Sequence, residues 1–386
     1  MPELREHLLQ TPHSGIRRML ELAAAVPDPV MLVNGDPNFT TPGHIIDAAA
    51  VAAHRGGTGY APGGGLPDLR AAVAAKVSAR NGITASADQV CVTTGACGGL
   101  YTVLMLVAGP GDEVLLPDPG WSNYAAMTHV LGARGVGYPA GEAAGWSVRA
   151  HELEAVITPR TRAILVNSPS NPTGAMASAG QLGELLEVAR RHDLWVISDE
   201  AYDEIVLDPA DRHTSMASLG GADRVLSVFS FSKTYAMTGW RVGYVTGPAG
   251  FIRQLSLHQE PVVSCASTVS QHAALAALSG PQDCVGHMVS AYRDRRDAAM
   301  AQLSSAGCDL VRPRGGFFLM ADIRPTGLGS WDFAAKLLEQ EKVGVVPGAA
   351  FGQLGEGFVR VSLAVSDDVL SRGVAGLAAM IGRYGR

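Results

Sequence analysis

The stretch that most constrains the fold is an apolar run followed at once by a turn rich in serine. The run is VLSVF, Val225–Phe229, whose β-branched and aromatic residues are typical of a buried strand. The turn that follows it is SFSKTYAMTGWR, Ser230–Arg241. Because open α/β sheets bind ligands at the carboxyl ends of their strands, we predict an α/β fold with a ligand site at this turn.

Lys233 is the candidate reactive group of this turn. It is one of four lysines in a chain with 30 basic residues. Ser230 and Ser232 precede it, and Arg241 follows eight residues later. A lysine amine can form an adduct with a carbonyl compound, and the neighbouring donors suit an anion. A solvated turn lysine is the alternative, because short motifs also match by accident.

The composition limits what kind of protein the chain encodes. Its 386 residues suffice for two or three domains, and only 17% are charged against a usual ~25%, which suggests that an oligomer buries part of the surface. The net charge of −6 provides no basic stripe for nucleic acid. No apolar run reaches the ~18 residues of a membrane span, and the start MPELREHLLQ lacks the apolar core of a signal peptide. We therefore expect a cytoplasmic protein without membrane or nucleic-acid partners.

Neither disulfides nor a metal site is expected. The five cysteines are odd in number and widely spaced, with no CxxC pair, so we expect them to be reduced. The chain also lacks an HExxH motif and a Walker lysine loop, which argues against a zinc protease and a P-loop enzyme.

Five further motifs accompany the lysine turn. They are TTGAC (Thr93–Cys97), DPGW (Asp118–Trp121), SPSNPTG (Ser168–Gly174), SDEAYDE (Ser198–Glu204) and FVRVSLA (Phe358–Ala364). With these motifs the chain resembles the class I and II aminotransferases, which are pyridoxal-phosphate enzymes of fold type I. The resemblance runs from about Ile16 to the C-terminus and is specific, because five separated motifs must coincide.

The resemblance implies an α/β fold with a large domain built on a mostly parallel sheet and a smaller α+β domain. Residues 1–45 would form an N-terminal arm and part of the small domain. Residues 46–280 would form the large domain that binds pyridoxal 5'-phosphate, and residues 281–386 the small C-terminal domain.

One end of the implied site would hold the cofactor phosphate. The sequence predicts a strand ending at Thr93 and a helix from about Ala96, and the free N–H groups at a helix N-terminus suit a phosphate. An ordinary helix start is the alternative. The resemblance assigns the phosphate to the following residues: the backbones of Gly95, Ala96 and Cys97, the side chains of Ser230 and Ser232, and the fork of Arg241, which is expected on a strand WRVGYVTGP.

Four side chains would surround the cofactor ring. The resemblance stacks Trp121 on the ring and places Asn171 and Tyr202 at the ring oxygen. Asp199 would pair with the protonated ring nitrogen, since a buried carboxylate at a strand end needs a partner. A core position is the alternative for Trp121.

Arg360 is the candidate substrate anchor. A lone arginine inside the apolar strand FVRVSLA is expected to need an anion. The resemblance names that anion as the substrate α-carboxylate, whereas a salt bridge to an internal acid is the alternative. Asn171 would also contact the substrate, and Gly35 would let the backbone of the arm approach it closely.

Tyr60 lies in the glycine-rich loop GGTGYAPGGG. The resemblance makes it a phosphate ligand that is donated to the neighbouring subunit, so we expect a homodimer with shared active sites. Interface packing is the alternative for a lone tyrosine.

The resemblance implies a ping-pong aminotransferase that moves an amino group from an amino acid to a 2-oxo acid. Lys233 would hold the cofactor as a Schiff base and, once released, act as general acid and base. Asp199 and Tyr202 complete the predicted catalytic group.

Two other functions are compatible with the same motifs. Lyases, decarboxylases and oxidases of this fold hold the cofactor with the same residues, because such motifs report cofactor chemistry better than the bond that is cleaved. A non-enzymatic domain that senses a ligand is the second of these alternatives. The roughly 15 residues before the resemblance are too few for a helix-turn-helix.

Hydrophobic periodicity predicts the remaining elements. Helices are expected at Ile16–Ala25, Gln181–His192 and Asp283–Ala306, and several helical stretches are expected from Phe251 to Gly280. The last hundred residues are expected to alternate the strands DLVRP, GGFFLMADI, VGVVPG and FVRVSLA with the helix WDFAAKLLEQ and a final helix.

Overall fold

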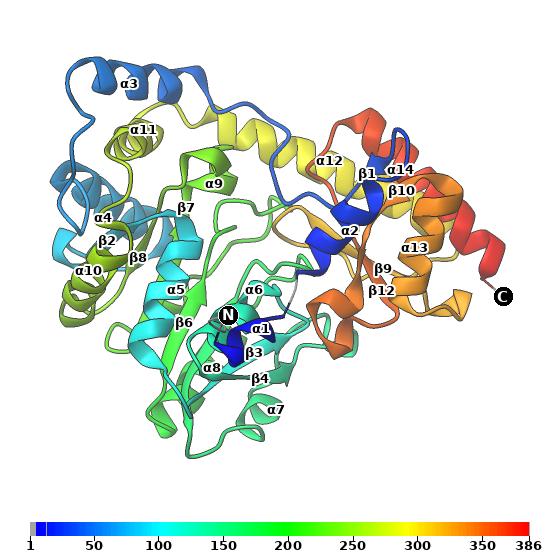
Figure 1. The fold of residues 1–386 in the computed structure, drawn as a ribbon, viewed down its shortest axis with the longest axis horizontal. Coiled ribbons are helices and arrows are strands. Elements are labelled where there is room, and N and C mark those ends of the chain that lie inside the picture. The colour runs from blue at the N-terminus through cyan, green and yellow to red at the C-terminus, as the bar shows by residue number, and fades with distance from the viewer. Residues whose placement is uncertain (1–4, 13, 386) are drawn as a thin grey trace, which may run out of the picture.

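A seven-stranded sheet forms the centre of the larger part of the molecule (Figure 1). The computed structural model describes residues 5–12 and 14–385, so Met1–Leu4 of the N-terminal stretch lie outside it. The strands lie in the order β2 (Val90–Thr93), β8 (Gly243–Thr246), β7 (Val225–Ser230), β6 (Trp195–Asp199), β5 (Thr161–Asn167), β3 (Glu113–Asp118) and β4 (Arg134–Pro139). Strand β8 runs antiparallel to both of its neighbours, and every other pair is parallel.

Helices cover both faces of this sheet, because successive side chains of a strand point to opposite faces. Along β3, Val114 and Leu116 pack in one apolar cluster, and Leu115 between them packs in another. The first cluster includes residues of α5, and the second includes residues of α8. The helices of this part are α3 (Gly43–His54), α4 (Pro67–Asn81), α5 (Gly95–Val107), α6 (Asn123–Val130), α7 (Ala150–Glu154), α8 (Ala179–Arg191), α9 (Phe231–Thr234), α10 (Ala249–Val263) and α11 (Thr268–Ser279).

The smaller part combines two short sheets with three long helices. Its strands are β1 (Val30–Met31), β9 (Phe318–Asp322), β10 (Val343–Gly344), β11 (Val346–Pro347) and β12 (Phe358–Ser362). Strands β11, β12 and β9 form an antiparallel sheet, and β1 pairs in parallel with β10. Its helices are α12 (Asp283–Ser305), α13 (Ser330–Glu341) and α14 (Asp367–Tyr384), and the N-terminal helices are α1 (Glu6–Leu9) and α2 (Gly15–Ala23). The predicted α/β fold with a larger, mostly parallel sheet and a smaller α+β part is confirmed.

Several predicted elements have the expected positions. Helices α2, α8 and α12 match the three corresponding predictions to within two residues at each end. The helical stretches expected from Phe251 to Gly280 are the two helices α10 and α11, which are separated where the chain turns at Ser264, whose φ is +61°. The predicted strand VGVVPG is divided between β10 and β11, which pair with different partners.

Two predicted strand positions are wrong. Residues 309–313 (DLVRP) form no strand, and Arg312 within this segment pairs with Asp208 at 3.1 Å. Proline at position 313 also lacks the N–H that a ladder needs. Arg241 does not lie on a strand, because its left-handed backbone (φ 51°, ψ 53°) ends a short 3₁₀ turn, Thr238–Trp240, before β8 begins.

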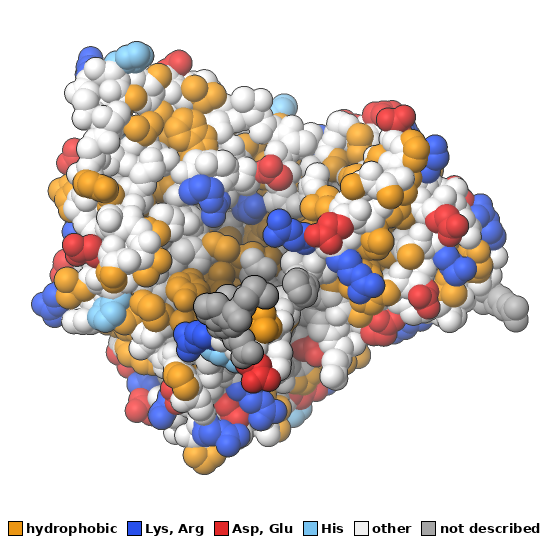
Figure 2. Space-filling model, in the orientation of Figure 1, with side chains coloured by type: hydrophobic (Ala, Val, Ile, Leu, Met, Phe, Trp, Pro, Cys, Tyr) orange, Lys and Arg blue, Asp and Glu red, His pale blue; other side chains and the backbone are white. Residues whose placement is uncertain are grey.

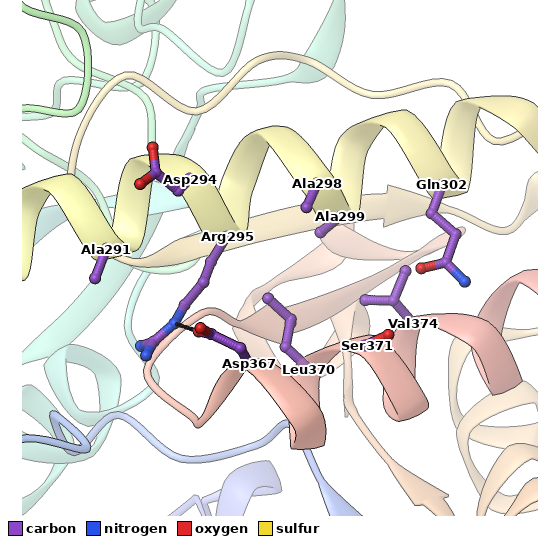
Figure 3. A pocket seen from close by; sticks show the side chains of 10 residues that line it. All are labelled: Ala291, Asp294, Arg295, Ala298, Ala299, Gln302, Asp367, Leu370, Ser371 and Val374. Atoms are coloured by element: carbon purple, nitrogen blue, oxygen red, sulfur yellow. Dashed lines mark hydrogen bonds and ion pairs between the residues drawn. The ribbon is translucent and has the colours of Figure 1, made fainter.

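A cavity of about 440 Å³ lies between α12 and α14 (Figure 3). Arg295 and Asp367 form an ion pair of 2.6 Å at one end of it. None of the predicted site residues lines this cavity.

In the described part of the chain, no helix is both long enough and apolar enough to cross a membrane. All five cysteines are unpaired thiols.

Candidate active site

A cavity of about 270 Å³ collects side chains from distant parts of the chain. Three of its residues, Asn167, Asp199 and Ser230, are the last residues of the parallel strands β5, β6 and β7. Figure 2 shows a hollow near the middle of one face of the molecule, with Lys and Arg side chains gathered on its rim.

Most of the predicted site residues line this cavity. They are Gly35, Ala96, Cys97, Trp121, Asn171, Asp199, Tyr202, Ser230, Ser232, Lys233, Arg241 and Arg360. Five lining residues were not predicted, namely Ile16, Leu100, Tyr124, Asn167 and Ala201. Gly95 adjoins the cavity through Arg241, and Tyr60 lies outside it.

The end of the cavity at α5 is suited to an anion. Gly95 begins α5 with φ +72°, and Thr94 makes no side-chain cap, so the side chain before the helix occupies none of its first N–H groups. A Cβ atom at Gly95 would lie 2.8 Å from Arg241 Nη2, so the guanidinium lies directly against the helix N-terminus. A helix N-terminus and a guanidinium both favour negative charge.

The backbone around Arg241 explains how it reaches this position. Its left-handed conformation turns the chain just before β8, and its Nη1 donates to the carbonyl of Thr238 at 2.8 Å. Ser230 and Ser232 lie nearby in the turn, where Ser230 Oγ accepts from the Ser232 N–H at 3.1 Å. The two serines and Arg241 therefore surround the same end of the cavity.

Asp199 is a buried carboxylate at the end of β6. Its Oδ2 accepts from Tyr124 Oη at 2.6 Å, and its Oδ1 accepts from the Ala201 N–H at 3.1 Å. Burial raises the pKa of Asp199 to about 6, although the two hydrogen bonds act in the opposite direction. A cationic group in the cavity would satisfy this carboxylate and lower its pKa.

Tyr124 is the main polar residue that the sequence analysis missed. It follows Trp121 by three residues, and the two rings pack edge to face with centroids 5.3 Å apart. Because residues three apart share one side of a helical turn, a tyrosine at this spacing from a predicted site residue was a usable signal. Its hydroxyl fixes the orientation of the Asp199 carboxylate.

Tyr202 and Asn171 line the same cavity as Asp199 and Arg360. Burial raises the pKa of Tyr202 well above its ordinary value, so its hydroxyl keeps its proton. The Asn171 Oδ1 accepts from Arg360 Nη1 at 2.9 Å, and the Asn171 N–H donates to Asn167 Oδ1 at 2.8 Å. Asn171 is thus held by two residues that also line the cavity, whereas the ring of Tyr202 packs edge to face against Phe317 and Phe318 outside it.

Lys233 lies on α9, directly after β7, and its amine faces the N-terminal arm. The Nζ atom donates to the carbonyl of Gly35 at 2.6 Å. Burial, together with the positive charges of Arg241 and Arg360, lowers the pKa of Lys233 to about 8, while Asp36 opposes this change. An amine with this pKa is partly unprotonated near neutral pH, as a nucleophile or a general base requires.

Arg360 is fully buried on β12 and has no acidic partner among the described residues. Its Nη2 donates to the carbonyl of Val33 at 2.6 Å, and its buried Nε has no hydrogen-bond partner in the part of the chain that the structure describes. The rings of Phe318 and Phe351 pack against the guanidinium, with their centroids 4.1 and 4.8 Å from Arg360 Cζ. Burial lowers the pKa of Arg360 to about 9. No described carboxylate lies within 4.0 Å of it, so the alternative of an internal salt bridge does not hold for the described chain.

Tyr60 is 91% exposed and does not contribute to the cavity of its own chain. A large aromatic side chain with this exposure is available to another molecule. Its role in a neighbouring site stays a prediction.

Comparisons with known proteins agree on one family. The model for aminotransferase class I and II matches residues 27–377. An aspartate aminotransferase of Rhizobium meliloti (strain 1021) is 39% identical over 368 residues, which cover 92% of this chain and 89% of the relative. An arginine–pyruvate transaminase of Pseudomonas aeruginosa is 42% identical over 347 residues, which cover 88% and 87%. The structure of the aspartate aminotransferase from Thermus thermophilus with maleate has a TM-score of 0.94 at 33% identity, covering 98% of this chain and all of that one.

Proposed function

Because this chain belongs to the class I and II aminotransferases, a family that uses pyridoxal 5'-phosphate, we propose that it transfers amino groups at the cavity around Lys233. The donor is an amino acid and the acceptor a 2-oxo acid. The observation that carries the proposal is the buried guanidinium of Arg360, which has no acidic partner in the described chain. An α-carboxylate is the anion that both substrates share, and a guanidinium binds it with two parallel hydrogen bonds.

The residues of the cavity fit pyridoxal 5'-phosphate. The uncapped start of α5 and the adjoining Arg241 suit the phosphate, and the buried Asp199 carboxylate, whose hydrogen bonds come from the neutral groups of Tyr124 and Ala201, suits a protonated ring nitrogen. We assign the phosphate to Gly95, Ala96, Cys97, Ser230, Ser232 and Arg241, and the ring to Trp121, Asn171, Asp199 and Tyr202. When bound, the cofactor supplies an aldehyde that takes up the amino group and a ring that withdraws electrons from Cα.

The residues of the chain have separate roles in the proposed reaction. Arg360 binds the α-carboxylate and so fixes the orientation of the substrate about Cα. Lys233 Nζ accepts and returns a proton at Cα, for which a pKa of about 8 is suitable. Asp199 would hold the ring nitrogen of the cofactor, and the Tyr124 hydroxyl holds that carboxylate in place. Binding of the α-carboxylate by Arg360 favours proton transfer at Cα over loss of carbon dioxide.

A screen of amino donors against several 2-oxo acids tests the proposal. The curated relatives described above are named for aspartate and for arginine with pyruvate, so the screen spans acidic, basic, aromatic and aliphatic donors. We expect 2-oxo acid formation that requires both substrates and disappears in Lys233→Ala. Release of ammonia, sulfide or carbon dioxide without an acceptor would support the lyase, decarboxylase or oxidase alternative. Binding without any turnover would support a sensor domain.

We also propose the domain division 1–45, 46–280 and 281–386. One apolar cluster supports it, because it joins Met19, Val30 and Leu32 of the N-terminal arm with residues of α12, α13 and α14. Other clusters hold the helices of the seven-stranded sheet. The arm therefore packs with the smaller part, although the larger part follows it in sequence.

The proposed functional unit is a homodimer in which each subunit donates Tyr60 to the other site. The exposure of Tyr60 supports this arrangement, as does the low share of charged residues. Exposed apolar side chains on α10, namely Leu257, Val262 and Val263, offer further surface for a partner.

A further inference from the structure

A buried group of polar side chains lies behind Asp199 and takes no part in the proposed function. Glu200 is 1% exposed, Ser198 is 4% exposed, and the side chain of His213 is 6% exposed. None of these three residues lines the cavity around Lys233. We call them the Glu200 clasp.

The hydrogen bonds of the clasp enclose the backbone of Asp199. Ser198 Oγ donates to Glu200 Oε1 at 2.9 Å, which joins the side chains immediately before and after Asp199. His213 Nε2 lies 2.9 Å from Glu200 Oε2, and Ser215 Oγ also donates to that oxygen. Both oxygens of Glu200 are thus occupied on the side of β6 that faces away from the cavity.

Strand geometry links this clasp to the direction of Asp199. Successive side chains of a strand point to opposite faces, so Ser198 and Glu200 share one face and Asp199 takes the other. The Glu200 N–H donates to the carbonyl of Val228 at 2.9 Å, which fixes the adjoining backbone. With the backbone and the rear side chains held, the Asp199 carboxylate has little freedom to turn from the cavity.

The charges of the clasp are balanced inside the protein. Burial alone would lower the pKa of His213, but the hydrogen bond and charge of Glu200 outweigh it and leave the pKa above its ordinary value. Asp203 adds to this effect, and Lys76 opposes it. A buried charged pair is costly compared with an apolar pair of similar volume. Stability is therefore a weak explanation for the clasp, and a role in local geometry is a better one.

The clasp continues into a second buried pair. Asn81 Nδ2 donates to Ser215 Oγ at 2.9 Å and to Asp203 Oδ2 at 3.0 Å. Lys76 Nζ donates to Asn81 Oδ1 at 2.9 Å and also pairs closely with Asp203. Residues of α4 and the Asp199–Tyr202 turn are thereby joined through one network.

We propose that Glu200 and His213 are positioning residues that act through Asp199, holding its carboxylate toward the cofactor ring. The proposal rests on the assignment of Asp199 to the ring nitrogen made above. Neither residue touches the cavity, so each affects the reaction only through the strand end that it holds.

A double-mutant cycle on cofactor affinity tests this role. The dissociation constant of pyridoxal 5'-phosphate is measured for Glu200→Gln and His213→Leu, each in the natural and in the Asp199→Asn background. We expect each substitution to weaken binding about tenfold in the natural background and less than about twofold beside Asp199→Asn, because the interaction runs through Asp199. His213→Gln, which can still donate to Glu200, is expected to restore most of the affinity. In turnover, kcat should fall while the KM of the amino donor stays near its natural value, since Arg360 is untouched.

His192 and Glu154 provide a matched control. They form a His–Glu pair of the same kind at 2.8 Å, but on the surface, with about a third of each side chain exposed. His192→Leu should leave cofactor affinity and kcat unchanged. If Glu200→Gln and His213→Leu do not fold, Ser198→Ala replaces them in the double-mutant cycle. This variant removes the hydrogen bond from Ser198 to Glu200 without leaving a charge unpaired.

The outcomes separate the two proposals. Equal losses of affinity in both backgrounds, or no loss in either, would show that the clasp is only structural. If Asp199→Asn itself leaves cofactor affinity and kcat unchanged, the proposed role of Asp199 is wrong and the positioning role is wrong with it.

Discussion

Lys233 Nζ donates a hydrogen bond to the carbonyl of Gly35 at 2.6 Å, across 198 positions of the chain. The contact joins the turn after β7 to the N-terminal arm. Two further bonds hold the arm there, because Thr238 Oγ1 donates to Asp36 Oδ1 at 2.5 Å and Thr41 Oγ1 donates to the carbonyl of Ala236 at 2.6 Å. The arm thus closes one side of the cavity and places the charge of Asp36 near the lysine.

The lowered pKa of Lys233 predicts how cofactor uptake depends on pH. The pKa lies near 8 against an ordinary 10.5, so the neutral amine becomes the main form above about pH 8. Below that value, the rate of pyridoxal phosphate uptake by the cofactor-free protein should rise about tenfold per pH unit, and above it the rate should level off. Stopped-flow absorbance measures this rate.

Asp36→Asn is the companion variant for this profile. Asp36 raises the pKa of Lys233, so its neutralisation should move the levelling point to lower pH. A profile that levels only near pH 10 would show that the amine is not desolvated as described.

Asp199→Ala should separate cofactor binding from turnover. The phosphate end of the cavity is intact in this variant, so saturating pyridoxal phosphate should still be taken up. Without the carboxylate at the ring nitrogen, kcat should fall by about a hundredfold or more. Steady-state kinetics at saturating cofactor measure the change, and turnover near the natural rate would refute the assigned role.

Arg360→Met should impair substrates but not the cofactor. The loss of two charge-assisted hydrogen bonds to an α-carboxylate should lower kcat/KM by about a hundredfold for every donor and acceptor. Pyridoxal phosphate affinity should change less than about twofold. Arg372→Met, an exposed arginine of α14 whose side chain is 59% exposed, should change neither value. A loss confined to a single donor would contradict binding of the group that all substrates share.

Hybrid dimers test whether Tyr60 serves the neighbouring site. Lys233→Ala and Tyr60→Ala subunits are mixed, allowed to exchange and assayed. With shared sites, half of the dimers are hybrids and each hybrid keeps one intact site, so activity should recover to about a quarter of the natural value. No recovery, with exchange verified by mass spectrometry, would mean that the loop does not act across an interface.

Three charged residues of the cavity are well predicted from the sequence, because each lies within or shortly after an apolar strand pattern. Asp199 directly ends the apolar strand LWVIS, Lys233 follows VLSVF, and Arg360 interrupts FVRVSLA. These three positions could be read from local pattern, and the structure brings them to one cavity. Their roles at the cofactor stay proposals.

What the sequence did not predict depends on tertiary structure. The partner of Arg360 Nη2 is the carbonyl of Val33, 327 positions away. Arg241 reaches the start of α5 through a left-handed backbone that periodicity does not report. Tyr124 becomes significant only when its hydroxyl is known to meet Asp199.

The most direct test of the account is a half-reaction with an amino donor and no acceptor. The enzyme loaded with pyridoxal phosphate is mixed with excess donor, and both the 2-oxo acid released and the absorbance of the bound cofactor are measured. We predict one equivalent of 2-oxo acid per active site, after which the reaction stops with the amino group retained on the cofactor. Addition of a 2-oxo acid should then restore the original spectrum. Continuous turnover of the single substrate, with release of ammonia, sulfide or carbon dioxide, would contradict transamination.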